Sequence, residues 1–150
     1  MATENPATYT IETENFTLTN PTKTGYTVAG WTGTDLTEAT TTVTIANGTI
    51  DNRSYTATWT PNPYKVHFNA NNGTGTMEDQ NFVYDAPQAL TENTFTRSGY
   101  TFNGWNTKAD GSGDAYADKA SVKNLTTEAN ATINLYAQWQ LITYTLTYDL

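Results

Sequence analysis

The sequence predicts a β-rich α+β fold of two tandem small repeat modules, with mostly antiparallel or mixed strands and little helix. A seven-residue frame occurs at Gly25–Trp31 and returns at Gly99–Trp105, an offset of 74 residues (99 − 25). Each copy is closed by a strand-like run that ends in Trp, at Tyr55–Trp59 and Tyr136–Trp139. Thr fills 33 of the 150 positions beside 10 Tyr, 4 Trp and 5 Phe, a composition that favours strands. Internal repetition on this scale decides the architecture.

The second copy begins with an alternating run at Tyr64–Ala70. Tyr64, Val66 and Phe68 fall on one face, which is typical of a half-buried strand. Asn71–Gly75 ends this strand with residue types that tolerate positive φ.

The remaining elements of the second copy follow in order. They are an extended run at Asn81–Tyr84, a poor central strand at Ala86–Leu90, an alternating strand at Tyr100–Trp105, a turn at Asp110–Asp114, a stretch of mixed periodicity at Tyr116–Leu125 and a last strand at Ile133–Trp139. Pro87 weakens the run at Ala86–Leu90 as a strand, because proline has no backbone N–H to donate to a neighbouring strand. Gly104 indicates a bulge or a close backbone approach, and Tyr116–Leu125 could hold one short helical turn.

The first copy follows the same plan from Thr10 to Trp59. Ile11, Phe16 and Leu18 precede its frame, Thr41–Ile45 follows it, and Thr60–Pro63 forms a short, stiff linker to the second copy. The predicted modules are residues 1–61 and 62–141.

The two ends of the chain are predicted to be out of phase with the repeats. The second copy opens with the strand of Tyr64, whereas no such strand precedes Thr10. A matching strand stands instead at Tyr144–Leu150, with Tyr144 placed 80 residues after Tyr64 (144 − 64). Residues 142–150 are therefore expected to be the first strand of a following repeat. The candidate donor residues are Tyr144, Leu146 and Tyr148.

These motifs resemble the Listeria–Bacteroides repeat family, which includes the internalin B-repeat. The resemblance rests on Asn72-Gly73, Thr96–Thr107 and Leu135–Trp139 in copy two, and on Pro21–Trp31 and Tyr55–Trp59 in copy one. It implies small β-grasp-like modules, found in arrays on secreted and surface proteins of bacteria, with no catalytic residues. The positions expected to be structural are Gly25, Tyr26, Gly30, Trp31, Trp59, Gly99, Tyr100, Gly104, Trp105 and Trp139. Copy one departs from the pattern, because it lacks the opening strand and its Asn-Gly turn.

Charge and composition argue against several classes of binding partner and bear on the location of the chain. The net charge of −8 and the pI near 4.3 argue against nucleic acid and anionic membranes. No apolar run approaches the ~20 residues of a membrane span, and the chain has no Cys. Met1–Pro6 carries no signal peptide, so the chain is expected to be either cytosolic or a piece of a longer exported protein. The resemblance favours the second, with an extracellular location on the bacterial surface.

No residue set in the sequence predicts catalysis, a cofactor or a metal site. His67 is expected to be a solvent-facing strand residue, and Asp110–Asp114 a plain turn rather than a calcium loop. Glu78 and Asp79 are adjacent on a strand, so their carboxylates are expected to point to opposite faces.

The leading functional hypothesis is a non-enzymatic stalk, spacer or adhesion module whose partners are neighbouring repeats, other copies of itself or a host-surface protein or glycan. Its C-terminal strand could join an open edge of copy one, between molecules or within one, or both pieces could simply be frayed. The alternative is a carbohydrate-binding module that uses exposed aromatics. Lys–Asn isopeptide cross-links are a further option, with Lys23, Lys65, Lys108, Lys119 and Lys123 as donors.

Overall fold

A computed structural model describes residues 4–150, so residues 1–3 of the predicted first module lie outside the described part. The chain forms two compact units, here called unit 1 (up to Asn62) and unit 2 (Pro63–Leu150). The described residues form strands and no helix. The β-rich prediction is therefore confirmed, whereas the expected helical turn at Tyr116–Leu125 is not found.

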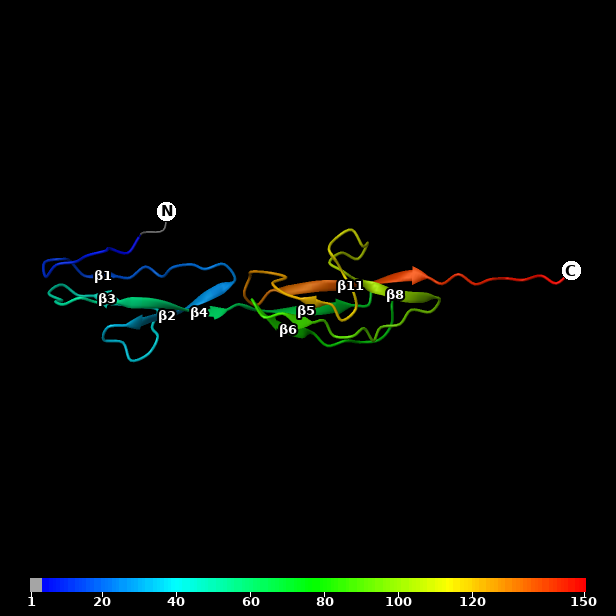
Figure 1. Cartoon of the computed structure of the whole chain (residues 1–150), viewed down its shortest axis with the longest axis horizontal. Helices are drawn as coiled ribbons and strands as arrows, with labels where there is room; N and C mark the ends of the chain where they lie inside the picture. Colours follow the sequence, from blue (N-terminus) through cyan, green and yellow to red (C-terminus); the bar gives the residue numbers. More distant parts are fainter. Residues whose placement is uncertain (1–3) are drawn as a thin grey trace. The chain divides into compact units, whose positions relative to one another are not determined.

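Unit 1 consists of two small antiparallel pairs (Figure 1). Its strands are β1 (Phe16–Thr17), β2 (Tyr26–Gly33), β3 (Thr44–Ile45) and β4 (Tyr55–Pro61); β1 pairs with β3 and β2 with β4. The buried core is small and consists of Trp31, Val43 and Ile45. Half-buried apolar side chains surround it, so much of the apolar surface of unit 1 remains within reach of solvent.

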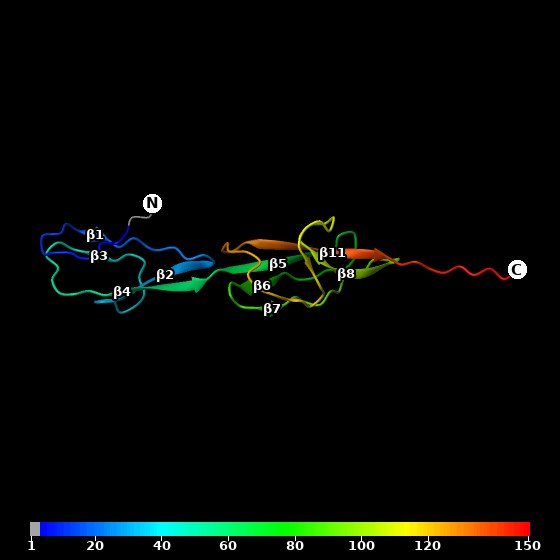
Figure 2. The same ribbon diagram turned by 45° about the horizontal axis from the view of Figure 1, so that its top comes forward.

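Unit 2 contains one five-stranded sheet and one short pair. Its strands are β5 (Pro63–Asn69), β6 (Gln80–Val83), β7 (Gln88–Ala89), β8 (Tyr100–Asn106), β9 (Ala115–Tyr116), β10 (Ser121–Val122) and β11 (Thr132–Leu141). The sheet has the order β6-β5-β11-β8-β9, and β10 pairs with β7. Figure 2 shows β5 beside β6 and β11. The β5–β11 pair is parallel and every other pair is antiparallel.

The predicted alternation of the first strand of unit 2 is confirmed. Tyr64, Val66 and Phe68 in β5 are buried, whereas Lys65 and His67 between them are exposed. Asn71 and Asn72, which follow the strand, have φ of 46° and 69°, as expected for residues that tolerate the left-handed region. This strand supplies three large side chains to a core that also contains Phe82, Leu90, Phe95, Trp105, Val122, Leu135 and Ala137.

A β-bulge interrupts β2 in unit 1 and β8 in unit 2, each at the second glycine of the repeated frame. In unit 2, Trp105 pairs with Ala137 and Phe102 with Trp139, so Asn103 and Gly104 together face the one residue between those partners. Gly104 has a φ of +96°, and a Cβ there would lie 2.8 Å from the carbonyl oxygen of Tyr116. The prediction of a bulge or a close backbone approach is confirmed in both senses.

The bulge in unit 1 also lies at a glycine that has positive φ and no room for a Cβ. Gly30 has a φ of +136°, and a Cβ there would lie 2.7 Å from the backbone nitrogen of Thr40. The register of β2 against β4 shifts between Val28 and Gly30.

Two predicted segments differ from the structure. Within Tyr116–Leu125, Lys119 and Asn124 have positive φ of 60° and 55°, which a right-handed helical turn cannot contain. The predicted linker Thr60–Pro63 is almost entirely strand, because β4 runs to Pro61 and β5 begins at Pro63. Only Asn62 lies between them, and its N–H donates to the Gly25 carbonyl at 2.9 Å.

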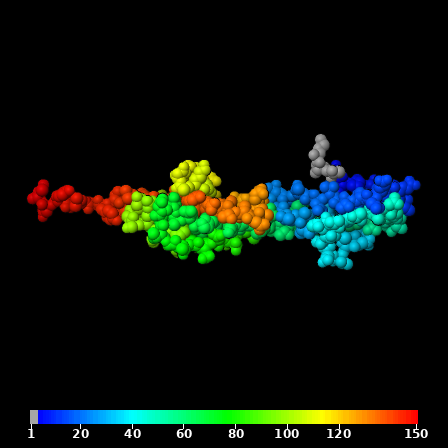
Figure 3. All heavy atoms as spheres, turned by 180° about the vertical axis from the view of Figure 1, so that it is seen from behind, coloured from blue at the N-terminus to red at the C-terminus, as the bar shows by residue number. Residues whose placement is uncertain are grey.

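The chain leaves unit 2 after β11 as an extended segment. The Ile142 N–H donates to the Gly99 carbonyl at 2.9 Å, and residues 143–150 belong to no strand. Tyr144, Leu146 and Tyr148 are 80%, 73% and 75% exposed. In Figure 3 the end of this segment, in red, extends beyond the rest of unit 2 as one extended chain.

Candidate functional site

The strand registers give a residue-by-residue correspondence between the two units. In unit 1, Ala57 pairs with Trp31 and Trp59 with Val28. In unit 2, Ala137 pairs with Trp105 and Trp139 with Phe102. β4 therefore corresponds to β11 with an offset of 80 residues (137 − 57).

A second correspondence joins the N-terminal segment of unit 1 to β6. The Thr13 N–H donates to the Thr10 carbonyl at 3.0 Å, and the Ala86 N–H makes a bond of the same spacing to the Val83 carbonyl at 3.2 Å, although Asp85 has a positive φ of 63° and Glu12 does not. This offset of 73 places Tyr9 at the position of Phe82, which is 1% exposed in unit 2.

The strand that corresponds to β5 is absent from the described part of unit 1. In unit 2, β5 lies between β11 and β6 and pairs with both. In unit 1, β4 pairs with β2 on one edge and has no other strand partner among residues 4–150. The edge of β4 that corresponds to the β5-binding edge of β11 therefore carries no strand within residues 4–150.

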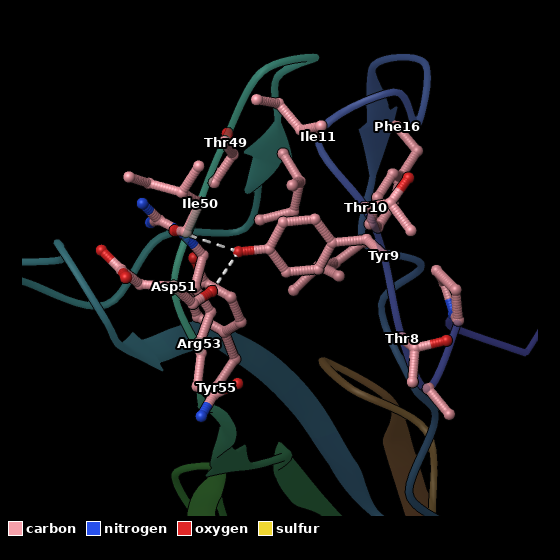
Figure 4. Close-up of a pocket in the computed structure, with 15 residues that line it drawn as sticks. Thr8, Tyr9, Thr10, Ile11, Phe16, Thr49, Ile50, Asp51, Arg53 and Tyr55 are labelled. Carbon is pink, nitrogen blue, oxygen red and sulfur yellow. Dashed lines mark hydrogen bonds between the residues drawn. The ribbon is translucent and has the colours of Figure 1, made fainter.

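A groove of about 600 Å³ lies at this position in unit 1 (Figure 4). Its apolar lining includes Tyr9, Ile11, Phe16, Leu18, Ile45, Ile50 and Tyr55. Ile11 and Ile50, both among the residues that line it, are 59% and 61% exposed, which is unusual for Ile. Polar residues, among them Thr10, Thr49 and Arg53, complete the lining, so the groove presents polar and apolar groups in similar measure.

The Tyr9 side chain reaches across the groove. Figure 4 shows its ring pointing from the N-terminal segment toward the opposite segment. Its hydroxyl donates to the carbonyl of Ile50 at 3.3 Å and also to that of Asp51. Both carbonyls lie in the segment just before β4, and Asp51 stands at the position of Ala131, whose carbonyl accepts from the Lys65 N–H of β5 in unit 2.

One cation lies in the groove lining. The Arg53 guanidinium forms an ion pair with Asp35 at 2.7 Å. Hydrogen bonds to Tyr55 and then to Asp35 raise the pKa of Arg53 above its ordinary value, so this group stays charged at all working pH values.

The sequence-predicted donor residues reproduce the face of β5. Adding the offset of 80 to Tyr64, Val66 and Phe68 gives Tyr144, Leu146 and Tyr148, which are all exposed. The tail thus presents the same alternation of large apolar side chains that β5 buries.

The other candidate residues form surface contacts. His67 is exposed, and its Nδ1 lies 2.7 Å from Asp79 Oδ1, while Lys65 Nζ lies 2.6 Å from Asp79 Oδ2. Hydrogen bonds from Lys65 and then His67 lower the pKa of the Asp79 carboxyl. Asp110 accepts from the Ser112 hydroxyl at 2.6 Å, and this bond lowers the pKa of Asp110.

No group of three or more His, Cys, Asp or Glu that could hold a metal ion occurs within the described residues. Four of the five lysines considered for isopeptide bonds lie against acidic or aromatic side chains: Lys23 on Tyr26, Lys65 on Asp79, Lys119 on Glu92 and Lys123 on Asp85.

Three of the four tryptophans, Trp31, Trp105 and Trp139, lie in or beside the cores. Trp105 is 1% and Trp31 9% exposed, and the Trp31 indole N–H donates to Asn20 Oδ1 at 2.8 Å. Trp139 is half-buried and donates to the Ala70 carbonyl at 2.9 Å. Trp59, also half-buried, lies 5.9 Å from Lys23 Nζ. The four Trp residues are therefore either buried or half-buried.

The groove itself was not predicted from the sequence. Tyr9 and Arg53 belong to no motif, Tyr55 was expected only as the start of the closing strand, and the only signal was the missing strand before Thr10.

Two corresponding β units, with the same bulged glycine frame and the same closing strand, define a tandem β-repeat protein. The chain belongs to the Listeria–Bacteroides repeat family, whose domain matches residues 2–56 and 64–138. The resemblance drawn from the repeated frame is thereby confirmed.

Two relatives come from Evansella cellulosilytica. One, named as a Gly-rich membrane protein, is 31% identical over 141 residues, 87% of this chain and 16% of the relative. The other, named as a membrane protein, is 35% identical over 93 residues, 59% of this chain and 13% of the relative. The chain thus spans less than a fifth of either relative. No solved structure matches it. The described residues include no helix long and apolar enough to cross a membrane.

Proposed function

We propose that the chain is a non-enzymatic segment of an extracellular repeat array on a bacterial surface protein, where it acts as a stalk, spacer or adhesion module. Membership of the repeat family supports this role, as do two much longer relatives that are named as membrane proteins. The β-grasp-like character of each module is part of the same proposal.

The array is held together in part by strand donation from the C-terminal segment. One observation carries this proposal: Tyr144, Leu146 and Tyr148 repeat the buried face of β5 but are 73–80% exposed. Large apolar side chains that alternate on an extended segment are suited to adding a strand to a sheet edge. The partners are neighbouring repeats or other copies of the chain.

The test is a deletion of Thr143–Leu150. Light scattering of the intact chain should give a mass that rises with protein concentration, whereas the truncated chain should remain a monomer. An intact chain that stays monomeric at high concentration would contradict self-association.

The carbohydrate-binding alternative has weaker support. Its best candidates within the units are the half-buried Trp59 and Trp139, and the indole N–H of Trp139 already donates to a backbone carbonyl. Glycan-array binding that is lost on Trp59→Ala, in a chain that remains folded, would favour this alternative.

A further inference from the structure

We infer that the turn after β3 is a site of covalent modification, at which the Asn47 side chain deamidates through attack by the Gly48 backbone nitrogen. Conversion replaces a hydrogen-bond donor by an anion and releases the segment Ile11–Asn15, which the turn holds. The reaction needs only the chain and water, so it is independent of the proposed stalk role.

Three hydrogen bonds join the turn to the N-terminal segment. The Asn47 Nδ2 donates to the Thr13 carbonyl at 3.0 Å, and the Asn47 N–H donates to Asn15 Oδ1 at 2.6 Å. The Gly48 N–H donates to the Ile11 carbonyl at 3.0 Å. The amide that reacts and the nitrogen that attacks it are therefore both held by the same neighbouring segment.

The reaction takes place between two adjacent residues. The Gly48 nitrogen attacks Cγ of Asn47 and the Cγ–Nδ2 bond breaks, so ammonia leaves with the hydrogen of the Gly48 N–H and a five-membered succinimide forms. Water then opens the ring at either carbonyl, which gives an aspartyl or an isoaspartyl residue. One water is consumed and one ammonia is released. Glycine favours ring closure because it has no side chain to shield its nitrogen and its backbone rotates freely.

The surroundings of the glycine distinguish this site from the other Asn–Gly pairs, which begin at Asn72 and Asn103. All three asparagines are exposed. A Cβ on the glycine after Asn72 would lie 2.6 Å from the Trp139 ring, and one on the glycine after Asn103 would lie 2.8 Å from the Tyr116 carbonyl oxygen. A Cβ at Gly48 would meet no atom within 4 Å. Ring closure requires the backbone to rotate at this peptide, which the open turn permits and the two enclosed glycines oppose.

The contacts that restrain the turn lie at the surface. Ile11 is 59% exposed, Asn15 is also exposed and Thr13 is half-buried. Segments with few buried apolar contacts open locally at low free energy. The three hydrogen bonds therefore slow the reaction without preventing it.

Unit 2 has the same contact without the reactive glycine. β10 corresponds to β3, and with an offset of 77 (124 − 47) Asn124 takes the position of Asn47. Asn124 Nδ2 donates to Asp85 Oδ1 at 2.8 Å, and Asn124 Oδ1 accepts from the Asp85 N–H at 2.6 Å. The residue after Asn124 is Leu125, whose branched side chain shields its own backbone nitrogen. Asn124 is thus an internal reference that should remain an amide.

Conversion at position 47 weakens the attachment of the N-terminal segment. An ionised carboxylate has no donor, so it cannot bond the Thr13 carbonyl. It also adds one negative charge to a chain whose net charge is already −8. The isoaspartyl product further lengthens the backbone of the turn by one carbon, which displaces the Gly48 N–H from the Ile11 carbonyl.

The site is tested by peptide mapping of the intact chain after ageing in neutral buffer. Digestion with an acid-active protease stops the reaction, because the attacking nitrogen must lose its proton. Asn47 should convert at least about tenfold faster than Asn72 and Asn103, and Asn124 should not convert measurably. In urea, the three Asn–Gly pairs should convert at similar rates. Conversion of Asn72 or Asn103 as fast as that of Asn47 in the folded chain, or conversion of Asn47 in urea only, would overturn the inference.

The restraint by the N-terminal segment is tested with two asparagine variants. Asn15→Ala removes the bond to the Asn47 N–H and should accelerate conversion roughly three- to tenfold. Asn5→Ala is the matched control, since the Asn5 side chain bonds only the Thr19 backbone, at 3.0 and 2.7 Å, and it should change the rate less than about twofold. Equal acceleration by both variants, or by neither, would contradict restraint by the bonds to the turn.

Release of the segment is tested by hydrogen exchange of the Asn47→Asp chain, which has the aspartyl product from the start. The Gly48 amide should exchange roughly three- to tenfold faster than in the parent chain. Asn103→Asp adds the same charge at an exposed position of β8 and should leave the Gly48 amide unchanged. If the Gly48 amide exchanges alike in both variants, conversion does not release the segment.

Discussion

The rings of Phe102 and Trp105 meet edge to face with centroids 5.0 Å apart, although the residues are three positions apart on one strand. In a regular strand such residues would point to opposite faces. The bulge at Asn103 and Gly104 shifts the phase and returns both rings to one core. The second glycine of the repeated frame is therefore what lets the strand contribute two aromatics.

Replacing the bulge glycine should destabilise unit 2 much more than replacing the turn glycine. Gly104→Ala places a Cβ 2.8 Å from the Tyr116 carbonyl oxygen at a φ of +96°, so we expect a loss of about 2–4 kcal/mol. Gly99 has a φ of +79° with no atom within 4 Å of a Cβ, so Gly99→Ala should cost only about 1–2 kcal/mol. Urea unfolding measures both. Equal losses would show that the close approach at Gly104 relaxes freely.

Unit 1 should unfold at a lower temperature than unit 2. Its buried core has three residues, Trp31, Val43 and Ile45, whereas that of unit 2 has ten. Apolar burial is the main source of stability, so calorimetry should resolve two transitions. Ile45→Ala should lower the first transition and Val122→Ala, at the corresponding position, the second. A single transition that both variants shift alike would contradict separate unfolding.

A peptide with the sequence of β5 should stabilise unit 1 and leave unit 2 unchanged. Pro63–Asn69 has the alternation that fills the corresponding position in unit 2, so it should raise the first calorimetric transition as its concentration rises. A peptide in which Val66 is replaced by Asp serves as the control. Stabilisation by both peptides to the same extent would count against recognition of the apolar face.

The Asn20 side chain should contribute to the stability of unit 1 through the Trp31 indole. Asn20 Oδ1 accepts from this N–H at 2.8 Å, and Asn20 Nδ2 donates to the Thr41 carbonyl at 3.0 Å. Asn20→Ala leaves a buried donor without a partner, which costs about 1–3 kcal/mol. Asn20→Asp keeps the acceptor and should lose less. The indole N–H resonance of Trp31 in an NMR spectrum should shift most in the Ala variant; no shift would mean that the bond is absent in solution.

The contribution of Asp79 to stability should depend on pH. Its folded pKa lies below the ordinary 3.8, because Lys65 and then His67 donate to the carboxylate. The stabilisation is therefore present above pH 3.8 and is lost as the pH falls through the lower folded value. Asp79→Asn should lower the melting temperature at neutral pH and converge with the parent chain in acid. Glu78→Gln is the control, and a difference that persists at pH 2 would exclude this linkage.

The long strands β5, β8 and β11 were predictable because each has a local signature. Tyr64, Val66 and Phe68 alternate, and glycine in an alternating strand marks the bulge. Tyr116–Leu125 was misjudged because the close approach of Gly104 holds Tyr116 in a strand and Lys119 adopts a left-handed conformation. Neither constraint is visible in local periodicity.

The groove could be anticipated only as a missing strand. The volume of the groove depends on where the N-terminal segment packs beside Ile50 and Asp51. The hydrogen bonds that Tyr9 makes across the groove depend on the same placement. That placement is a tertiary outcome for which residues 4–15 carry no strand pattern.

The parallel pairing of β5 with β11 has a mechanical consequence. A pull applied between Pro63 and Leu141 draws these neighbouring strands in opposite directions along their length. The evenly spaced ladder from Lys65–Thr132 to Asn69–Tyr136 then resists as a set, loaded in shear, instead of opening one bond at a time. In the stalk role proposed above, the chain would be loaded in this way whenever the cell and its attachment point move apart.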